Sequence, residues 1–339
     1  MTDRNFDRRS PADGYRIGIV NPTTLVGREL ASILEERAFP AARTVAIDAT
    51  GEHEGALTEV GGAASVLIPA SPETLAELDL VFFCGPAEKN APWIARHHDD
   101  GFIAIDLSDT AAAPEDSLPI VAGVNGDSIG YETTLILSPA AFALPLILIL
   151  DVLRKSFPVE SAVATVTRPA SSFDQRGIDE LYQQTVSVLN LKPLPQEVFD
   201  RQSAFAAYSP ADAQREEALA LAQLHAILGR DLPVSILMTQ ASLFHSTAMA
   251  LFVSFAEMPD TSRLREMLGR HPAIYVTDEG DPVTSVDAAG KDEVIIGRIA
   301  PGERGFWIWS ATDNLRRGTA LNAALIAEIL VEKFGPRPN

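Results

Sequence analysis

The sequence has almost no cysteine. Cys84 is the only one in 339 residues. A lone cysteine excludes an internal disulfide framework and any zinc site built on several cysteines, so we expect no metal site. The same scarcity is what a reducing compartment permits, and it predicts a cytoplasmic protein.

Basic side chains are also scarce. The chain has 27 Lys and Arg residues against 46 Asp and Glu, which gives a formal net charge of −19. A surface of this sign repels phosphate backbones and anionic lipid headgroups. The composition therefore argues against nucleic acid and membrane surfaces as partners.

The sequence has no apolar run that suits a membrane span, which takes about 20 residues. Its most apolar stretch, residues 135–150, contains Pro139 and Pro145 and is followed at once by Asp151. We expect a buried strand, a turn and a buried helix there. Residues 1–14 are polar and charged without the apolar segment of a signal peptide, which predicts a disordered N-terminal tail.

What the first half does contain is an alternation of strands and helices. Strand-like apolar segments at 15–20, 44–47, 78–84 and 101–107 are interleaved with helical periodicity at 26–34 and 87–98. This order is typical of a parallel, doubly wound sheet with both faces covered. We predict a Rossmann-like α/β domain over residues 15–142.

The pattern changes after Phe157. Amphipathic helices are predicted at 176–189 and 212–228, and strands at 161–167, 235–239, 248–255, 273–277, 294–299 and 306–310. Such an order favours an α+β domain with a mixed or antiparallel sheet, which we place at residues 143–318. The amphipathic helix at 319–334 should return to the first domain, which then comprises 15–142 and 319–339.

Three stretches resemble aspartate-semialdehyde dehydrogenases in order and spacing. They are Val26-Gly27-Arg28-Glu29-Leu30, Asp231-Leu232-Pro233-Val234-Ser235 followed by His245-Ser246, and Asp313-Asn314-Leu315-Arg316-Arg317-Gly318 with Asn322. The chain is similar to the family from Tyr15 to Phe334, and in particular to its cysteine-less Usg-type paralogues. The resemblance implies an NAD(P)-binding-type first domain, a second domain of the substrate and dimerisation type, and a homodimer.

The family's nucleophile is missing from its usual place. Family members attack an aldehyde with a thiolate that lies at the start of a helix, where the backbone amides lower the thiol pKa. Here the matching stretch is Ser138-Pro139-Ala140-Ala141-Phe142, and the nucleophile position falls on Ala141. Cys84 ends a strand in a different loop, where a small apolar residue is the simpler interpretation.

Other positions that hold the family's substrate are also altered. By resemblance, the family's catalytic glutamine falls on Arg168. The charged substrate-binding groups fall near Ala112, Leu219, Gln223 and Leu243. An anionic substrate would lose its charged partners there. His245 matches the family's catalytic histidine, but without a nucleophile a hydrogen-bonding or packing role has equal weight.

The cofactor loop carries side chains where the family has glycine. The three glycines fall on Asn21, Thr24 and Gly27, and a Cβ in such a loop fills the space of the pyrophosphate. Asp48 follows Gly27 by about twenty residues, where an acid selects the ribose of NAD over that of NADP. The family-equivalent cofactor positions are Asn21, Thr23, Thr24, Val26, Gly27, Asp48, Asn314 and Asn322. The resemblance thus implies NAD(P), whereas the loop residues predict weak or lost binding.

Three functions remain open. The altered positions favour a catalytically inactive scaffold or regulator, as a homodimer or as a hetero-dimer with an active homologue. The second is an NAD-dependent oxidoreductase of non-covalent chemistry, which would use Asp48 and His245. The third is a binder of an apolar small molecule in the inherited cleft, lined by Ala140, Ala141, Phe142, Leu243 and Phe244.

Overall fold

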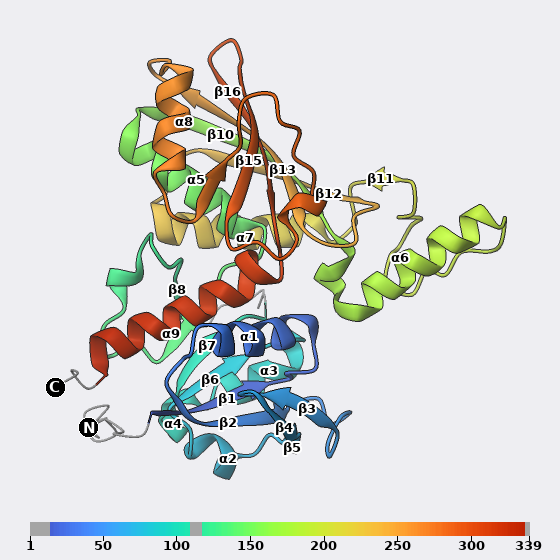
Figure 1. Cartoon of the computed structure of the whole chain (residues 1–339), viewed down its shortest axis with the longest axis vertical. Helices are drawn as coiled ribbons and strands as arrows, with labels where there is room; N and C mark the ends of the chain where they lie inside the picture. The colour runs from blue at the N-terminus through green and yellow to red at the C-terminus, as the bar shows by residue number, and fades with distance from the viewer. Residues whose placement is uncertain (1–13, 109–116, 336–339) are drawn as a thin grey trace. The chain divides into compact units, whose positions relative to one another are not determined.

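A computed structural model describes residues 14–108 and 117–335 (Figure 1). The expected tail, apart from Gly14, and the position of Ala112 lie outside the described residues. The chain folds into two compact units, one of residues 1–139 and 319–339 and the other of residues 140–318. Within the described ranges, no helix is long and apolar enough to cross a bilayer.

The first unit contains a 7-stranded sheet in the order β5-β2-β1-β6-β7-β9-β8, and all its neighbouring strands are parallel. The strands are β1 Tyr15–Val20, β2 Ala41–Asp48, β5 Ile68–Pro69, β6 Leu80–Phe83, β7 Ile103–Asp106, β8 Leu118–Pro119 and β9 Leu135–Leu137. The chain changes direction across the sheet between β1 and β6, and the carboxyl ends of strands at such a point are where doubly wound folds bind ligands. The predicted Rossmann-like sheet is confirmed.

Helices cover both faces of this sheet (Figure 1). They are α1 Leu25–Glu36, α2 Pro72–Ala76, α3 Ala87–Ile94, α4 His97–Asp100 and α9 Leu321–Phe334. Alternate residues of β6 point to opposite sides: Leu80 and Phe82 pack with α1 and α9, whereas Val81 and Phe83 pack with α2 and α3. Because both faces are buried, the strand is apolar throughout.

The second unit is built on another 7-stranded sheet, in the order β11-β12-β10-β13-β16-β15-β14. Its strands are β10 Val159–Arg168, β11 Ala207–Tyr208, β12 Val234–Ala241, β13 Thr247–Phe255, β14 Ile274–Val276, β15 Val294–Pro301 and β16 Gly305–Thr312. The β10–β12 and β14–β15 pairs are parallel and the others antiparallel, which confirms the predicted mixed sheet.

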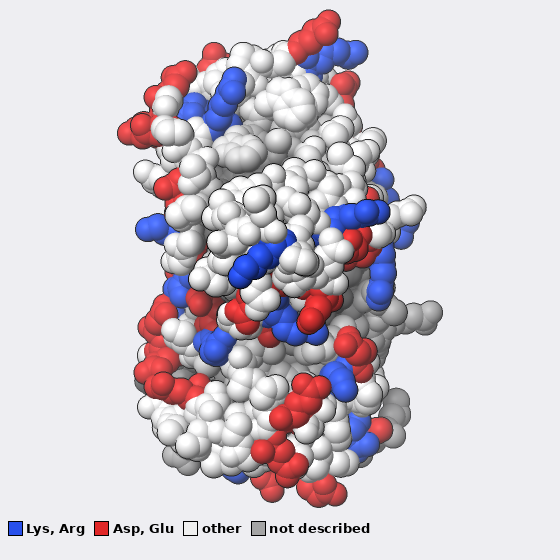
Figure 2. All heavy atoms as spheres, turned by 90° about the vertical axis from the view of Figure 1, so that its right-hand side faces the viewer, with Lys and Arg blue, Asp and Glu red and all other residues white. Residues whose placement is uncertain are grey.

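One face of the second sheet is covered by helices α5, α7 and α8, which contact one another and the strands. The helices of this unit are α5 Ala143–Ser156, α6 Asp174–Leu189, α7 Ala213–Leu228 and α8 Thr261–Gly269. Large apolar side chains on the strands remain exposed, among them Val163 at 45%, Leu237 at 51% and Trp307 at 48%. Charged side chains are sparse over a broad part of the molecular face in Figure 2.

Several short elements were missed in the sequence. They include the two-stranded hairpin of β3 Leu57–Val60 and β4 Ala63–Val66, the edge strands β5, β8 and β11, and helices α2 and α8. Short helical turns lie at Gly126–Ser128, Ala170–Phe173 and Val286–Ala288, and a π-helical turn at Arg316–Ala320. The helix expected at 87–98 is instead α3 and α4, and Pro92 within α3 cannot donate a backbone hydrogen bond.

We expect Gly27→Ala to destabilise the protein by about 1–3 kcal/mol, because overpacking against backbone cannot relax easily. A Cβ at this position would lie 2.6 Å from the Asn21 carbonyl oxygen and 2.7 Å from Pro22 Cα. Chemical denaturation measures the change. Gly130→Ala is the matched control, since no atom lies within 4 Å of its Cβ position; equal losses for the two variants would contradict the packing argument.

Candidate functional site

The loop after β1 is held by the side chain of Asn21, which is 3% exposed. Its Nδ2 donates to the Cys84 carbonyl at 2.9 Å and to Asn90 Oδ1 at 3.1 Å, and its Oδ1 accepts from Ala49 N at 3.0 Å. Asn21 has a φ of 53°, the left-handed conformation that asparagine tolerates. Asn21, expected at the first glycine position, therefore links the segments that follow β1, β2 and β6.

Thr24, expected at the second glycine position, caps α1. Its Oγ1 accepts from Gly27 N at 3.1 Å and donates to the Asn21 carbonyl at 2.9 Å. With a φ of −66°, Thr24 avoids the left-handed conformation that a β-branched residue tolerates poorly. Thr23 and Val26 are half-buried beside it. One amide at the start of α1 is thus already bonded to the protein itself.

The carboxylate of Asp48 is used by the loop that follows β2. It accepts from Thr50 N at 2.8 Å, from the Thr50 hydroxyl at 2.6 Å, from Gly51 N at 3.2 Å and from His53 N at 2.7 Å. Burial raises the pKa of Asp48, but these hydrogen bonds outweigh it and hold the pKa below its usual value. The acid expected at the ribose is therefore engaged by four donors of the chain.

Asn322, on α9, is also used within the first unit. It is 0% exposed. Its Oδ1 accepts from Ala122 N at 2.9 Å, and its Nδ2 donates to the Ile120 carbonyl at 2.9 Å and to Ser138 Oγ at 3.0 Å. The amide braces the segments around β8 and β9.

In the second unit, the position of the expected nucleophile lies just before α5. Ala141 precedes the N-cap residue Phe142, and Ala140 N donates to Gln223 Oε1 at 2.9 Å. The Ala141 Cβ lies 3.3 Å from the Cβ position of Gly318, so this small side chain adjoins the start of the π-helical turn. A helix N-terminus lowers the pKa of a thiol, but alanine offers none.

Cys84 follows β6 in the first unit and is 0% exposed. Burial raises the pKa of its thiol, and the negative charge of Asp106 raises it further. Only a thiolate is a good nucleophile. The single thiol of the chain is therefore held in its unreactive form.

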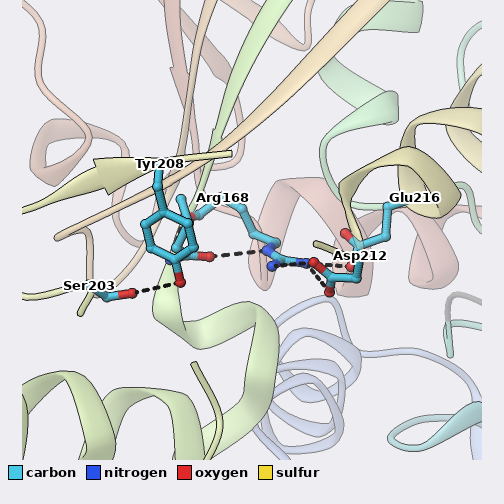
Figure 3. Close-up of polar contacts among 6 residues, drawn as sticks. Arg168, Ser203, Tyr208, Asp212 and Glu216 are labelled. Atoms are coloured by element: carbon cyan, nitrogen blue, oxygen red, sulfur yellow. Dashed lines mark hydrogen bonds and ion pairs between the residues drawn. The ribbon is translucent and has the colours of Figure 1, made fainter. Parts of the chain in front are cut away.

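Arg168, at the end of β10, makes ion pairs with the acidic side chains labelled in Figure 3. It is 5% exposed. Its Nη1 and Nη2 bond to the two carboxylate oxygens of Asp212 at 3.0 and 3.2 Å, and Nη1 also donates to Glu216. Its Nε donates to Gln240 Oε1 at 3.1 Å, and the guanidinium lies 4.3 Å from the ring centre of Phe173. All three guanidinium nitrogens of Arg168 therefore have hydrogen-bond partners, and one face of the group lies over an aromatic ring.

Two carboxylates share this one cation. Burial raises the pKa of Asp212, but the hydrogen bond and charge of Arg168 outweigh it, and the pKa lies below its usual value. The pKa of Glu216 lies above its usual value. Burial raises this pKa most, the charge of Arg168 lowers it, and the nearby Asp212 carboxylate raises it again. One acid of the pair therefore stays ionised while the other holds a proton more readily.

His245 is exposed, and the residue after it is strained. Ser246 is 0% exposed and has a φ of 67°, and its backbone N donates to Asn314 Oδ1 at 3.0 Å. The same Asn314 oxygen accepts from Ser171 Oγ at 3.0 Å. Asn314 therefore joins the His245 loop to the turn after β10, all within the second unit.

The sequence analysis singled out Arg168 but not its acidic partners. Asp212 and Glu216 lie before and in α7, more than forty positions away, and no local motif marks them. Gln240 pairs with Arg168 in the parallel register of β10 and β12, which the sequence alone does not give. Among the described residues, no group of three or more His, Cys, Asp or Glu side chains is placed to hold a metal ion.

Comparisons with known proteins cover nearly the whole chain. Residues 16–131 match the semialdehyde dehydrogenase NAD binding domain, and residues 150–317 match the semialdehyde dehydrogenase dimerisation domain. A USG-1 protein homolog of Pseudomonas aeruginosa is 30% identical over 333 residues, which are 94% of this chain and 98% of the relative. The chain belongs to the aspartate-semialdehyde dehydrogenase family.

Relatives of known function and structure fit the same family. An aspartate-semialdehyde dehydrogenase of Rickettsia bellii is 25% identical over 94% of this chain and 98% of its own. The structure of a probable aspartate-semialdehyde dehydrogenase from Pseudomonas aeruginosa has a TM-score of 0.88 and 29% identity, and the match covers 95% of this chain and 99% of that one. An aspartate semialdehyde dehydrogenase with NADP from Candida albicans, at 16% identity and a TM-score of 0.71, shares the fold.

We expect Arg168→Met to destabilise the protein by about 2–3 kcal/mol at pH 7, less than for a fully buried pair because Asp212 is half exposed. Without the cation, the two carboxyl groups repel each other, so their folded pKa values lie above the unfolded ones. The variant therefore gains stability as the pH falls through the raised pKa values of Asp212 and Glu216. The wild type instead loses the stabilisation by the Arg168–Asp212 ion pair when Asp212 becomes protonated. The difference in unfolding free energy should shrink towards pH 4.

Urea denaturation between pH 4 and pH 7 measures this difference. Arg201→Met, which changes an exposed arginine in the nearby loop, should alter stability by less than about 0.5 kcal/mol at every pH. A loss for Arg168→Met that does not vary with pH would mean that lost packing, and not charge, is the cause.

Proposed function

We propose that this chain is a catalytically inactive member of the aspartate-semialdehyde dehydrogenase family that acts as a dimeric scaffold or regulator. The observation that carries the proposal is the alanine at the start of α5, together with the burial of the only thiol. By the resemblance described above, the family's attacking cysteine falls on Ala141, next to the N-cap of α5, and Cys84 is 0% exposed at the end of β6. Acyl transfer through a thioester needs an accessible thiolate.

The groups around Arg168 support the same proposal. A carboxylate substrate would need a free cation, but the guanidinium already forms a two-oxygen pair with Asp212 and a further bond to Glu216. Gln223, near the family's glutamate position, is used in turn by the backbone of Ala140. Displacing these internal partners would cost a ligand most of the energy that its own contacts provide.

The nucleotide positions fit a tightly bound NAD(P) poorly. Thr24 carries a side chain where the family has a glycine, and the Asp48 carboxylate accepts four hydrogen bonds from its own loop. Asn21 and Asn322 are likewise bonded within the first unit. We therefore infer that dinucleotide binding is weak or lost, and that His245 is a remnant of the family's catalytic group.

The second unit supports a role in association. It matches a dimerisation domain, and its sheet leaves Val163, Leu237 and Trp307 exposed. Apolar side chains grouped in this way are typical of surfaces that other protein chains cover. We infer a homodimer, or a hetero-dimer with an active homologue, in the cytoplasm.

We expect neither NADH nor NADPH to bind in a saturable way below a concentration of about 100 μM, because the loop after β1 is already bonded to the protein. Nucleotide fluorescence measured with purified protein tests this. An active family member provides the positive control under the same conditions. Saturable binding in the micromolar range would instead favour the NAD-dependent oxidoreductase that uses Asp48 and His245.

We expect Ala141→Cys to gain a reactive thiol but no measurable dehydrogenase activity. The new cysteine lies at the N-terminus of α5, which favours the thiolate, so a disulfide reagent should modify one thiol per native chain. The anion-binding groups are still missing, so turnover of aspartate semialdehyde with NAD or NADP and phosphate should stay at background.

The wild-type protein is the matched control, because its buried Cys84 should react with the same reagent only after unfolding. Clear turnover by the variant would show that the rest of the site is competent and would end the proposal of an inactive scaffold. If the wild-type protein turned over the substrate, the proposal would fail more directly.

A further inference from the structure

Arg317 is a buried cation without a visible counter-ion. It lies on the π-helical turn Arg316–Ala320 and is 2% exposed. Its Nε has no hydrogen-bond partner in the part of the chain that the structure describes. Asp292 and Glu293 act on it only through their charge. Removing a guanidinium from water without an ion pair is strongly unfavourable.

Most of the acidic side chains that act on Arg317 or His271 by their charge, or that lie near Arg317 in the sequence, have partners of their own. Asp292 pairs with Arg316 at 2.5 Å, and Asp151 pairs with Lys155 at 2.7 Å. The Asp313 carboxylate accepts from the backbone N of Gly290, Leu315 and Arg316. Only Glu293, which is half-buried, is left as an alternative partner for Arg317.

A histidine lies within range of the charge of Arg317. Burial lowers the pKa of His271, and the positive charge of Arg317 lowers it further, while Asp151 and Lys155 act on it with opposite signs. The Nδ1 of His271 accepts from Ala273 N at 3.2 Å, which leaves Nε2 as the ring nitrogen that can donate. The positive charge of Arg317 therefore reaches His271, which favours the neutral imidazole.

Burial also lowers the pKa of Arg317 to about 10, and the charges of Asp292 and Glu293 only partly oppose the shift. The cation is therefore held in place at a free-energy cost that no described hydrogen bond offsets. A bound anion would remove this cost, because the guanidinium fork matches two oxygens of a phosphate or a carboxylate.

We infer that Arg317, buried with its Nε unpartnered, forms a binding site for a small oxyanion, a phosphate or carboxylate group. No family position discussed above assigns this role, and the inference does not depend on whether the chain is catalytically active. The protein as a whole is strongly acidic, so the attraction must come from this local charge.

The test measures the melting temperature in sodium phosphate and in sodium acetate, each against sodium chloride at the same ionic strength. We expect phosphate at ten times its dissociation constant to raise the wild-type melting temperature by roughly 2–4 °C above the chloride value. Arg317→Met keeps most of the aliphatic stem and should lose this rise. A response to both anions would indicate a general oxyanion site, and a response to phosphate alone a tetrahedral one.

Two controls keep the result interpretable. Phosphate stabilises many proteins by exclusion from their surface, so Arg298→Met, at an exposed position on β15, should keep the full response. If Arg317→Met does not fold, equilibrium dialysis of the wild type with phosphate should still give saturable binding near one anion per chain. Equal anion responses in wild type and Arg317→Met would overturn the inference, as would the absence of saturable binding.

Glu293→Gln tests whether an external anion or the Glu293 carboxylate neutralises Arg317. If an external anion neutralises Arg317, this variant should retain or strengthen the phosphate response, because it removes a competing negative charge. If Glu293 itself closes on Arg317 in solution, Glu293→Gln should lower the melting temperature in chloride as much as Arg317→Met does, while the wild type shows no response to phosphate. That result would overturn the site.

Discussion

Buried polar groups must be hydrogen-bonded, and in this chain the polar side chains of the inherited site obtain their partners from the protein itself. Asn21 ties three strand ends together, Asp48 holds the loop after β2, and Asn322 braces the segments around β8 and β9. These hydrogen bonds are all made within the first unit. In the loop after β1 itself, Gly27 is the position where a Cβ would meet the backbone of Asn21 and Pro22.

A buried charge likewise needs a partner, and the cluster at Arg168 is the example in the second unit. An arginine at the end of a buried strand is tolerated only with counter-ions, and Asp212 and Glu216 supply them from the start of α7. Phe173 and Gln240 complete its surroundings. The cation is therefore part of the structure of the second unit. Arg317 is the contrasting case, since no described carboxylate lies within ion-pair distance and the cost of burial remains.

Most of the fold could be predicted from the sequence. The apolar runs at β1, β6 and β7 and the long helices α6, α7 and α9 carry strong local signals, because strands buried on both faces are continuously apolar and surface helices are amphipathic. The hairpin of β3 and β4 could not, since its short strands alternate weakly and are stabilised by packing on α1 and β2. The helix expected at 87–98 is divided into α3 and α4 by a break at residues 95–96 that local periodicity did not reveal.

The sequence by itself determined that this chain has one cysteine, that alanines stand at 140 and 141 in the segment before α5, and that Gly27 is the only glycine from Asn21 to Gly27. These are properties of residue identity, and alignment with a familiar pattern is enough to find them. Only the tertiary structure decided that Cys84 is buried in the core and that the Asp48 carboxylate accepts hydrogen bonds from its own loop. It also decided that Arg168 forms ion pairs with Asp212 and Glu216. Burial and pairing depend on residues brought together from distant parts of the chain, and no local stretch of sequence carries that information.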